Sequence, residues 1–246
     1  MTTSSEGPPL RAGIRPLAHG ERANVDAVMR WRKATRQALL AERLAIADAD
    51  HVACSAAIHR HLGRAFLDVD GITIGFYWPH QREFDARPLI GDLSAKGAIC
   101  ALPVVAAPKC PLLFREWQVD TPLEAGRYGI PIPVGTRDVV PDVVLAPLNG
   151  FDTLGYRLGY GSGYFDRTLA ALGNRPTSIG IGFELARLES IYPQPHDVPL
   201  DFIVTEVGIC RSAAGGRMMN GSAKASRHVV PEIERQPDQS TPHPSS

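Results

Sequence analysis

The chain has 246 residues, its 26 basic and 26 acidic side chains balance to a formal net charge of zero, and 44% of its residues are apolar. This composition is sufficient for a hydrophobic core, whereas the balanced charge offers no electrostatic attraction to nucleic acid or to a membrane surface. No segment approaches the roughly 18 consecutive apolar residues of a membrane-spanning helix, and the N-terminal sequence lacks the apolar centre of a secretory signal.

The two ends of the sequence differ from its middle. Residues 1–23 show no apolar periodicity, and residues 213–246 carry almost no large apolar side chains. Such segments bury too little surface to offset the entropy lost on ordering, so we expect two disordered tails around one domain at residues 24–212. The four cysteines form no C-x-x-C pair and are expected to be free thiols of a cytoplasmic protein: Cys54, Cys100, Cys110 and Cys210.

In chain order, the first expected element is a helix that Asp26 caps and that runs to Leu44, and a second helix follows over about residues 50–66. Helical sequence returns at residues 86–95 and 164–172. Apolar, β-branched segments predict six strands, the third of them at a sheet edge: residues 72–78, 98–105, 112–117, 141–147, 177–183 and 201–207. Strands that alternate with helices indicate a single α/β domain of three layers, a mostly parallel sheet flanked by helices.

A glycine-rich segment at residues 155–167 lies between the fourth strand and the last helix. Glycine permits close main-chain approach, so successive N–H groups can converge on a phosphate, and the guanidinium of Arg157 matches phosphate geometry. The segment lacks the Gly-Lys-Ser/Thr of a P-loop, and Tyr164 stands where a dinucleotide fingerprint requires glycine. A plain surface loop is the alternative, although such a loop requires neither Arg157 nor Asp166.

The run from Phe151 to Asp166 resembles the ATP-binding loop of the 5-formyltetrahydrofolate cyclo-ligases, also called 5,10-methenyltetrahydrofolate synthetases. The resemblance extends over roughly residues 28–210 and includes several separated blocks in the order of the family: residues 32–36, 77–85, 101–103, 129–133 and 195–201. It implies an enzyme that uses ATP and Mg²⁺ to convert 5-formyltetrahydrofolate into 5,10-methenyltetrahydrofolate. Its partners are then small molecules, ATP and a reduced folate, and the oligomeric state is left open.

Carried over residue by residue, the resemblance implies a nucleotide site made by three arginines and the glycine loop: Arg32, Arg36, Arg157, Leu158, Gly159, Tyr160, Gly161, Ser162, Gly163 and Tyr164. Arg32 and Arg36 lie four residues apart and share one face of the first helix. Their alternative is a solvated face with pairing to Glu42 or Asp48.

The resemblance also implies that Asp166 and Asp197 hold Mg²⁺ and that Glu83, Tyr128 and Phe165 contact the folate. Four of these five residues have a structural alternative. Asp166 is also placed to cap a helix, Asp197 to stabilise a turn, and the two aromatic residues to fill the core.

Three departures from the family pattern leave two other functions open. Ile132 replaces a carboxylate, Phe165 replaces a tyrosine, and Ala186 lies in a segment that lacks a glutamine found in the family. One alternative is a related enzyme that uses ATP on another substrate. The other is a protein that binds folate or nucleotide without catalysis.

Overall fold

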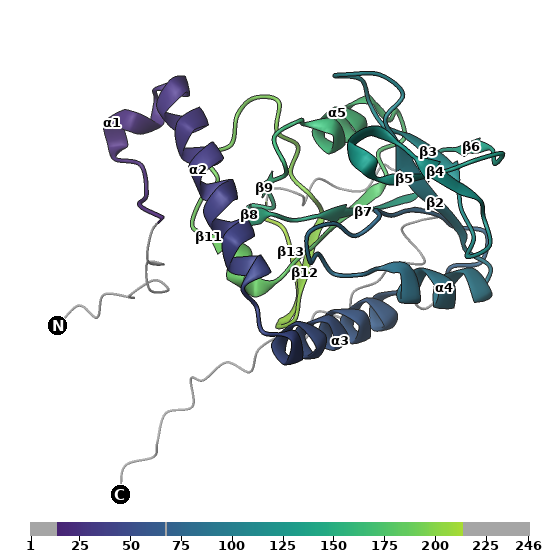
Figure 1. Cartoon of the computed structure of the whole chain (residues 1–246). Helices are drawn as coiled ribbons and strands as arrows, with labels where there is room; N and C mark the ends of the chain where they lie inside the picture. The colour runs from purple at the N-terminus through teal and green to yellow at the C-terminus, as the bar shows by residue number, and fades with distance from the viewer. Residues whose placement is uncertain (1–13, 67, 214–246) are drawn as a thin grey trace, which may run out of the picture.

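The computed structural model describes residues 14–66 and 68–213, which form a twisted sheet covered by helices (Figure 1). Five central strands are parallel, and the strands β13, β3 and β6 are antiparallel to their neighbours. In sheet order the strands are β13 (Gly208–Arg211), β12 (Phe202–Thr205), β10 (Thr177–Ile181), β7 (Val143–Pro147), β1 (Thr73–Gly75), β2 (Ile99–Val104), β3 (Leu113–Glu116) and β6 (Asp138–Val139). The expected α/β class with a mostly parallel sheet is therefore confirmed.

The central strand β7 shows why the sheet is buried on both faces. Successive side chains of a strand point to opposite faces, and β7 is apolar at each position. Val143 and Leu145 pack in the core beneath α3 (Asp48–Ala65) and α4 (Arg87–Ala95). Val144 and Ala146 pack on the other face, which α5 (Tyr164–Ala171) covers.

The long helix α2 (Val25–Leu44) packs at the side of the main sheet, against a second sheet of three short strands. These strands are, in sheet order, β11 (Arg187–Leu188), β8 (Gly150–Asp152) and β9 (Arg157–Leu158). Leu39 of α2 forms an apolar cluster with Leu158 and Leu188. The expected cap was wrong by two residues, because Asn24 rather than Asp26 accepts the amide of Ala27.

Two other expectations need correction. The strand at residues 112–117 is not an edge strand, because β6 pairs with its outer side. The glycine-rich segment does not follow β7 directly, because β8 lies between them and pairs with β9, which is itself the start of that segment. A further hairpin joins β4 (Leu123–Ala125) to β5 (Pro131–Pro133) through the short helix η1 (Arg127–Gly129), and η2 (Glu184–Ala186) precedes β11.

The described chain begins within the stretch that composition assigned to the N-terminal tail. Residues 14–23 include the short helix α1 (His19–Arg22), and Leu17 is only 5% exposed. The amide of Leu17 donates to the hydroxyl of Tyr192 at 2.8 Å, and the ring of Tyr192 packs edge-on against Trp31. Residues 1–13 and 214–246, to which the rest of the tail expectation applies, lie outside the described residues. None of the helices in the described ranges is both long and apolar enough to span a bilayer.

We predict that Leu17→Ala lowers the free energy of unfolding by about 2 kcal/mol, because it removes a buried side chain that attaches the N-terminal segment to the domain. Urea denaturation followed by circular dichroism measures the difference. The matched control is Val25→Ala, at a position 62% exposed, for which we expect a change below about 0.5 kcal/mol. Equal stability of Leu17→Ala and the wild type contradicts a docked segment.

Candidate active site

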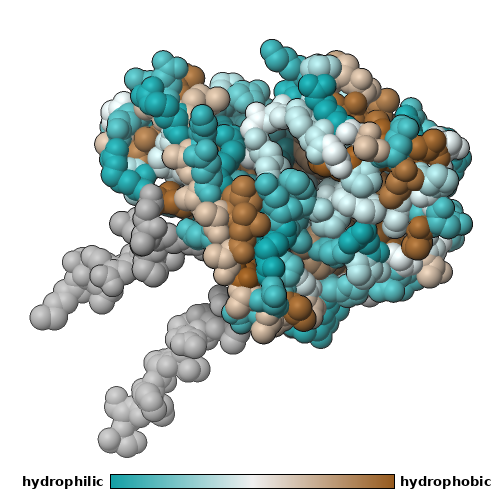
Figure 2. All heavy atoms as spheres, viewed as in Figure 1, coloured by the Kyte–Doolittle hydropathy of each residue, from teal (hydrophilic) through white to brown (hydrophobic). Residues whose placement is uncertain are grey.

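A cavity of about 450 Å³ opens at the carboxyl ends of β7, β1 and β2, where Pro147, Tyr77 and Pro103 contribute to its lining. The chain passes from β1 to β2 on one side and returns to β7 on the other, so the strand order reverses here. Ligands of open parallel sheets bind at such reversals. Figure 2 shows a hollow on this face of the molecule, with mostly polar residues around its rim.

The cavity collects residues from segments that are far apart in the sequence. Its lining includes every predicted site residue except Leu158, whose side chain is fully buried in the cluster with Leu39. Charged residues of the nucleotide prediction gather beside the glycine loop, whereas the other part of the lining combines apolar and aromatic residues with a few polar ones, Glu83 among them. The apolar group consists of Pro103, Val105, Leu112, Ile130, Ile132 and Pro147.

The glycine loop requires its glycines for two reasons. Gly161 and Gly163 have φ angles of +100° and +64°, a region that other residues adopt at a cost. At Gly159, a Cβ atom would lie 2.7 Å from Nη1 of Arg157. Gly163 then starts α5, whose N-terminal turn lies at the cavity. The loop thus presents main chain to the cavity where side chains would block it.

A buried ion pair links the two ends of the glycine loop. Nη2 of Arg157 donates to Oδ2 of Asp166 at 2.8 Å, and the two side chains are 3% and 11% exposed. The other oxygen of Asp166 accepts the amide of Val198 at 3.3 Å. Burial lowers the pKa of Arg157, and the charge of Asp166 opposes this change. Asp166 provides no cap for α5, so the capping alternative does not describe its contacts.

A second buried pair joins α2 to the loop between β11 and β12. Nη1 and Nη2 of Arg32 donate to the two carboxylate oxygens of Asp197 at 2.6 and 3.0 Å. Burial raises the pKa of Asp197, but the bonds from Arg32 and from the amide of Gln194 outweigh this effect, so that pKa lies below its ordinary value. The contacts of Asp197 therefore fit its structural alternative, since its hydrogen bond with the amide of Gln194 closes a turn.

Arg36 differs from these two arginines because it donates to a neutral acceptor, the carbonyl oxygen of Gly159, at 2.8 Å. Burial lowers its pKa, and repulsion from the nearby Arg32 lowers it further. Arg32 is buried and Arg36 is half-buried, so neither lies on a solvated face, and Asp48 contacts Arg82 instead. The arrangement leaves an excess of positive charge that an anion in the cavity would neutralise.

On the opposite side of the cavity, Glu83 is 7% exposed at the end of a turn that follows β1. Its Oε2 accepts the amide of His80 at 2.9 Å, and its Oε1 accepts the hydroxyl of Tyr160 at 2.6 Å. Burial raises the pKa of Glu83 above its ordinary value. Tyr160 thus contributes its main chain to the glycine loop and its side chain to the Glu83 side of the cavity.

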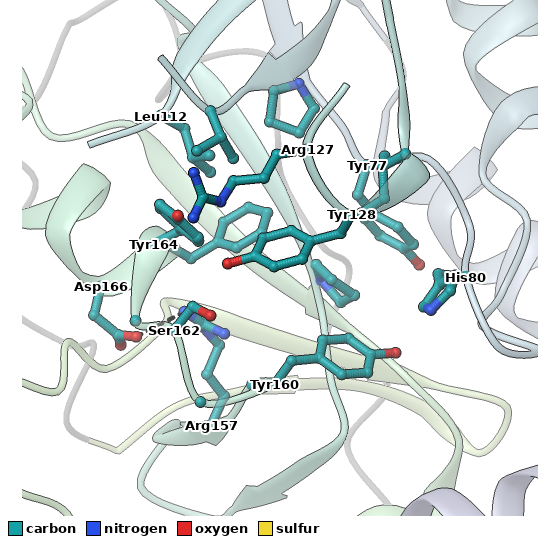
Figure 3. A pocket seen from close by; sticks show the side chains of 18 of the residues that line it. Tyr77, His80, Leu112, Arg127, Tyr128, Arg157, Tyr160, Ser162, Tyr164 and Asp166 are labelled. Carbon is teal, nitrogen blue, oxygen red and sulfur yellow. Dashed lines mark hydrogen bonds and ion pairs between the residues drawn. The ribbon is translucent and has the colours of Figure 1, made fainter. Parts of the chain in front are cut away.

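The β4–β5 hairpin crosses the cavity with Tyr128 at its tip. Tyr128 has a φ of +63°, and Figure 3 shows its ring between Tyr160 and the group of Arg127 and Tyr164. Hydrogen bonds with Arg127 first, and then with Tyr164 and Ser162, lower the pKa of the Tyr128 hydroxyl. The hairpin therefore brings this exposed phenol close to Ser162 and Tyr164 of the glycine loop.

Phe165 lies below the guanidinium of Arg157, whose carbon is 5.1 Å from the ring centre. The three departures from the family pattern differ in position. Ile132 and Phe165 line the cavity, whereas Ala186 is buried in the core beneath α5.

One buried residue beside the site is absent from the sequence predictions. Arg43 is 4% exposed, and its guanidinium donates to the hydroxyl of Tyr160 at 2.7 Å. The sequence does contain a pattern that indicates this position. Arg43 follows Arg36 by seven residues, two turns of a helix, so it lies on the same helical face as Arg32 and Arg36. The sequence alone does not connect Arg43 with the site, because the packing of α2 against the glycine loop is a tertiary feature.

We predict that Arg157→Met and Asp166→Asn each lower the free energy of unfolding by about 3 kcal/mol, because each leaves a buried polar partner without its counter-charge. The double variant is expected to lose less than the sum of the two. Urea denaturation without nucleotide measures all four corners of this cycle.

The control is Arg137→Met, which removes a more exposed pair with Glu116, 68% and 25% exposed and 2.6 Å long. Its expected cost is below about 1 kcal/mol. Additive losses for Arg157→Met and Asp166→Asn would contradict a direct contribution of their ion pair to stability.

Known proteins were compared with this chain in sequence and in structure. The model of the 5-formyltetrahydrofolate cyclo-ligase family matches residues 28–206. A protein of Mycolicibacterium smegmatis named 5-formyltetrahydrofolate cyclo-ligase is 30% identical over 179 residues, which are 69% of this chain and 91% of that protein. The protein of the same name from Haemophilus influenzae is 32% identical over 135 residues, which are 52% of this chain and 72% of that protein.

Two solved structures share the fold. The 5,10-methenyltetrahydrofolate synthetase of Aquifex aeolicus superposes with a TM-score of 0.66 at 24% identity, over 78% of this chain and 97% of that one. That of Mycoplasma pneumoniae gives a TM-score of 0.59 at 24% identity, over 71% and 98% of the respective chains. Because the family model spans most of the sequence and the fold agrees, the chain belongs to the 5-formyltetrahydrofolate cyclo-ligase family, whose members are ligases.

Proposed function

We propose that this protein converts 5-formyltetrahydrofolate into 5,10-methenyltetrahydrofolate with cleavage of ATP to ADP and phosphate. The observation that carries the proposal is the division of one cavity into two parts. Three arginines and the glycine loop line one part, and a buried carboxylate with apolar and aromatic residues lines the other. A triphosphate and a pterin require these two environments.

The proposed reaction proceeds in two steps. The formyl oxygen attacks the γ-phosphorus, the bond from phosphorus to the bridging oxygen breaks, and ADP leaves. The N10 lone pair then attacks the activated formyl carbon, the carbon–oxygen bond breaks to release phosphate, and N10 loses its proton. Phosphorylation is needed because direct ring closure would expel hydroxide, a poor leaving group. The protein must therefore align the oxygen with phosphorus and neutralise charge on the transferring group.

The part of the cavity proposed for the nucleotide contains the groups that would neutralise charge on the transferring phosphoryl group. Arg32, Arg36 and Arg157 supply positive charge beside the main chain of residues 159–163. Of the three arginines, Arg36 would gain most from a phosphate. Its hydrogen-bond acceptor is a neutral carbonyl, and the charge of Arg32 repels its guanidinium. A triphosphate there would supply the missing negative charge.

Asp166 and Asp197 are the carboxylates proposed to hold Mg²⁺. Their four oxygens already accept hydrogen bonds, and no group of three or more potential ligands occurs among the described residues. Mg²⁺ needs only one or two carboxylates when water and phosphate oxygens complete its shell, so both residues fit an ion that arrives with the triphosphate. Bound there, Mg²⁺ would neutralise phosphate charge.

Glu83 is the proposed partner of the pterin. Each carboxylate oxygen accepts one protein hydrogen bond and retains capacity for another, so the 2-amino group and a ring N–H of the pterin can donate to it. Tyr128 and Phe165 are proposed to contact the rings of the folate. The cytoplasmic location remains a prediction, based on the cysteine pattern.

We predict that the purified protein with Mg²⁺ and ATP forms one ADP per methenyl-folate produced, as measured by the absorbance of the product and a coupled ADP assay. Glu83→Gln is expected to lower kcat/KM for the folate by about tenfold to a hundredfold, because a charged hydrogen bond is lost. Its ATP affinity should stay near that of the wild type.

Glu124→Gln is the control, since Glu124 is exposed in β4 and lies outside the cavity lining. Firm ATP binding without methenyl product at saturating folate would favour a relative with another substrate. Absence of ADP formation with any acceptor would favour a binding protein without catalysis.

We predict that Gly161→Ala weakens ATP binding by about tenfold, because alanine strains a backbone with φ of +100° and shifts the amides that face the phosphates. Isothermal titration calorimetry with ATP measures the change. Gly173→Ala is the control, since a Cβ at that position meets nothing within 4 Å and no positive φ is required. Similar ATP affinities for both variants would contradict a phosphate-binding loop.

A further inference from the structure

Buried Arg43 connects three parts of the fold that meet at the cavity. Its Nε donates to the carbonyl of Gln81 at 3.0 Å, its Nη1 to that of Leu148 at 3.3 Å, and its Nη2 to the hydroxyl of Tyr160 at 2.7 Å. These acceptors belong to the Glu83 turn, the segment after β7, and the glycine loop. All three nitrogens therefore have acceptors, so Arg43 has a structural arrangement distinct from that of the phosphate arginines.

The hydrogen bonds from Arg43 through Tyr160 to Glu83 can run in only one direction. Arginine only donates, so the hydroxyl of Tyr160 accepts from Nη2. The single proton of this hydroxyl is then directed to Oε1 of Glu83, at 2.6 Å. An ionised Glu83 is the acceptor that completes this arrangement.

The turn that carries Glu83 is strained and closely held. Gln81 and Arg82 are consecutive residues with φ angles of +48° and +58°, an uncommon pair for side chains of this size. Besides the bond from Arg43, the guanidinium of Arg82 contacts Asp48 at 2.8 Å, and a ring nitrogen of His51 lies 3.1 Å from the carbonyl of Arg82. The α2 and α3 side of the molecule thus fixes the backbone of the turn, and Tyr160 reaches the carboxylate itself from the glycine loop.

We infer that Tyr160, held by Arg43, is a positioning residue that orients the Glu83 carboxylate for the pterin, an assignment that rests on the proposed function. It connects the two parts of the cavity, because the same residue supplies main chain to the nucleotide loop and a hydroxyl to the folate side. Figure 3 shows the phenol directed away from Arg157 and toward His80; its ring centre is 6.2 Å from that of His80.

The electrostatic surroundings of Glu83 are consistent with this assignment. Burial raises the pKa of Glu83, and the hydrogen bond from Tyr160 is the first of the effects that lower it, followed by the charge of Arg43 and the contacts with His80. The buried phenol of Tyr77 is a further titratable group that faces Glu83. Loss of the Tyr160 hydroxyl leaves burial less opposed, so the Glu83 pKa rises and its charged form is lost at a higher pH.

The decisive variant is Tyr160→Phe, which keeps the ring and removes the hydroxyl. We expect kcat/KM for 5-formyltetrahydrofolate to fall by about tenfold while KM for ATP stays within about twofold. The acid limb of the folate kcat/KM profile should move to higher pH. Tyr156→Phe is the matched control, because Tyr156 lies outside the cavity lining and packs beside Leu39 and Leu158.

Arg43→Lys gives a second test, since one ammonium group cannot reproduce three donors in three directions. It should shift folate kinetics in the same direction, and its effect should not add to that of Tyr160→Phe. Additive effects would overturn the assignment of Arg43 as the anchor of Tyr160.

A measurement without turnover separates this inference from the proposed function. In protein labelled with ¹³C at the glutamate carboxyls, Glu83→Gln assigns the Glu83 signal, and its pKa should be higher in Tyr160→Phe than in the wild type. An unchanged pKa together with unchanged folate kinetics overturns the inference, as does an equal loss of ATP and folate affinity. A wild type without methenyl product defeats the proposed function, while the titration still decides whether Tyr160 controls Glu83.

Discussion

Three guanidinium groups are buried around one cavity, and the cost of removing their charges from water constrains the surrounding structure. A buried charge requires a counter-charge or a full set of hydrogen bonds. Arg157 has Asp166, and Arg32 has both oxygens of Asp197. Arg43 instead has two carbonyls and the hydroxyl of Tyr160. Each solution requires an acceptor from a different segment, so the arginines add polar connections to the apolar contacts between α2 and the small sheet.

The same constraint explains the position of α2. Its apolar stripe packs through Leu39 onto the small sheet, and its basic stripe faces the cavity. The amide nitrogen of Asn149 adds a hydrogen bond to the carbonyl of Arg36 at 3.1 Å, so the segment after β7 is attached to the middle of the helix. The helix is therefore part of the site rather than an added cover, although its residues lie more than a hundred positions before the glycine loop.

The sequence is sufficient to predict the long elements, because the helices have a helical apolar period and the buried strands are continuously apolar. The helices at residues 50–66, 86–95 and 164–172 agree closely with α3, α4 and α5, and the six expected strands correspond to six of the eight strands of the main sheet, without β6 and β13. The small sheet was missed because β9 and β11 have two residues each, too few to show a period. The glycine loop is recognisable from its composition alone. Its contact with Glu83 is not, because the hydrogen bond from Tyr160 joins residues 77 positions apart in the sequence.

The two parts of the cavity differ in polarity: arginines and the glycine loop line one, and the other is rich in apolar and aromatic residues. The proposed chemistry needs both. Charge on a transferring phosphoryl group is stabilised by fixed positive groups, and these act most strongly where water is excluded. Apolar residues such as Leu112 and Ile132 line the same cavity as these charged groups. Tyr128 and Tyr160 lie at the boundary, and each has a hydroxyl held by protein contacts. In the proposed reaction the formyl oxygen meets the γ-phosphorus at this boundary, so residues that hold the glycine loop and the Glu83 turn in register would control the alignment of the two substrates.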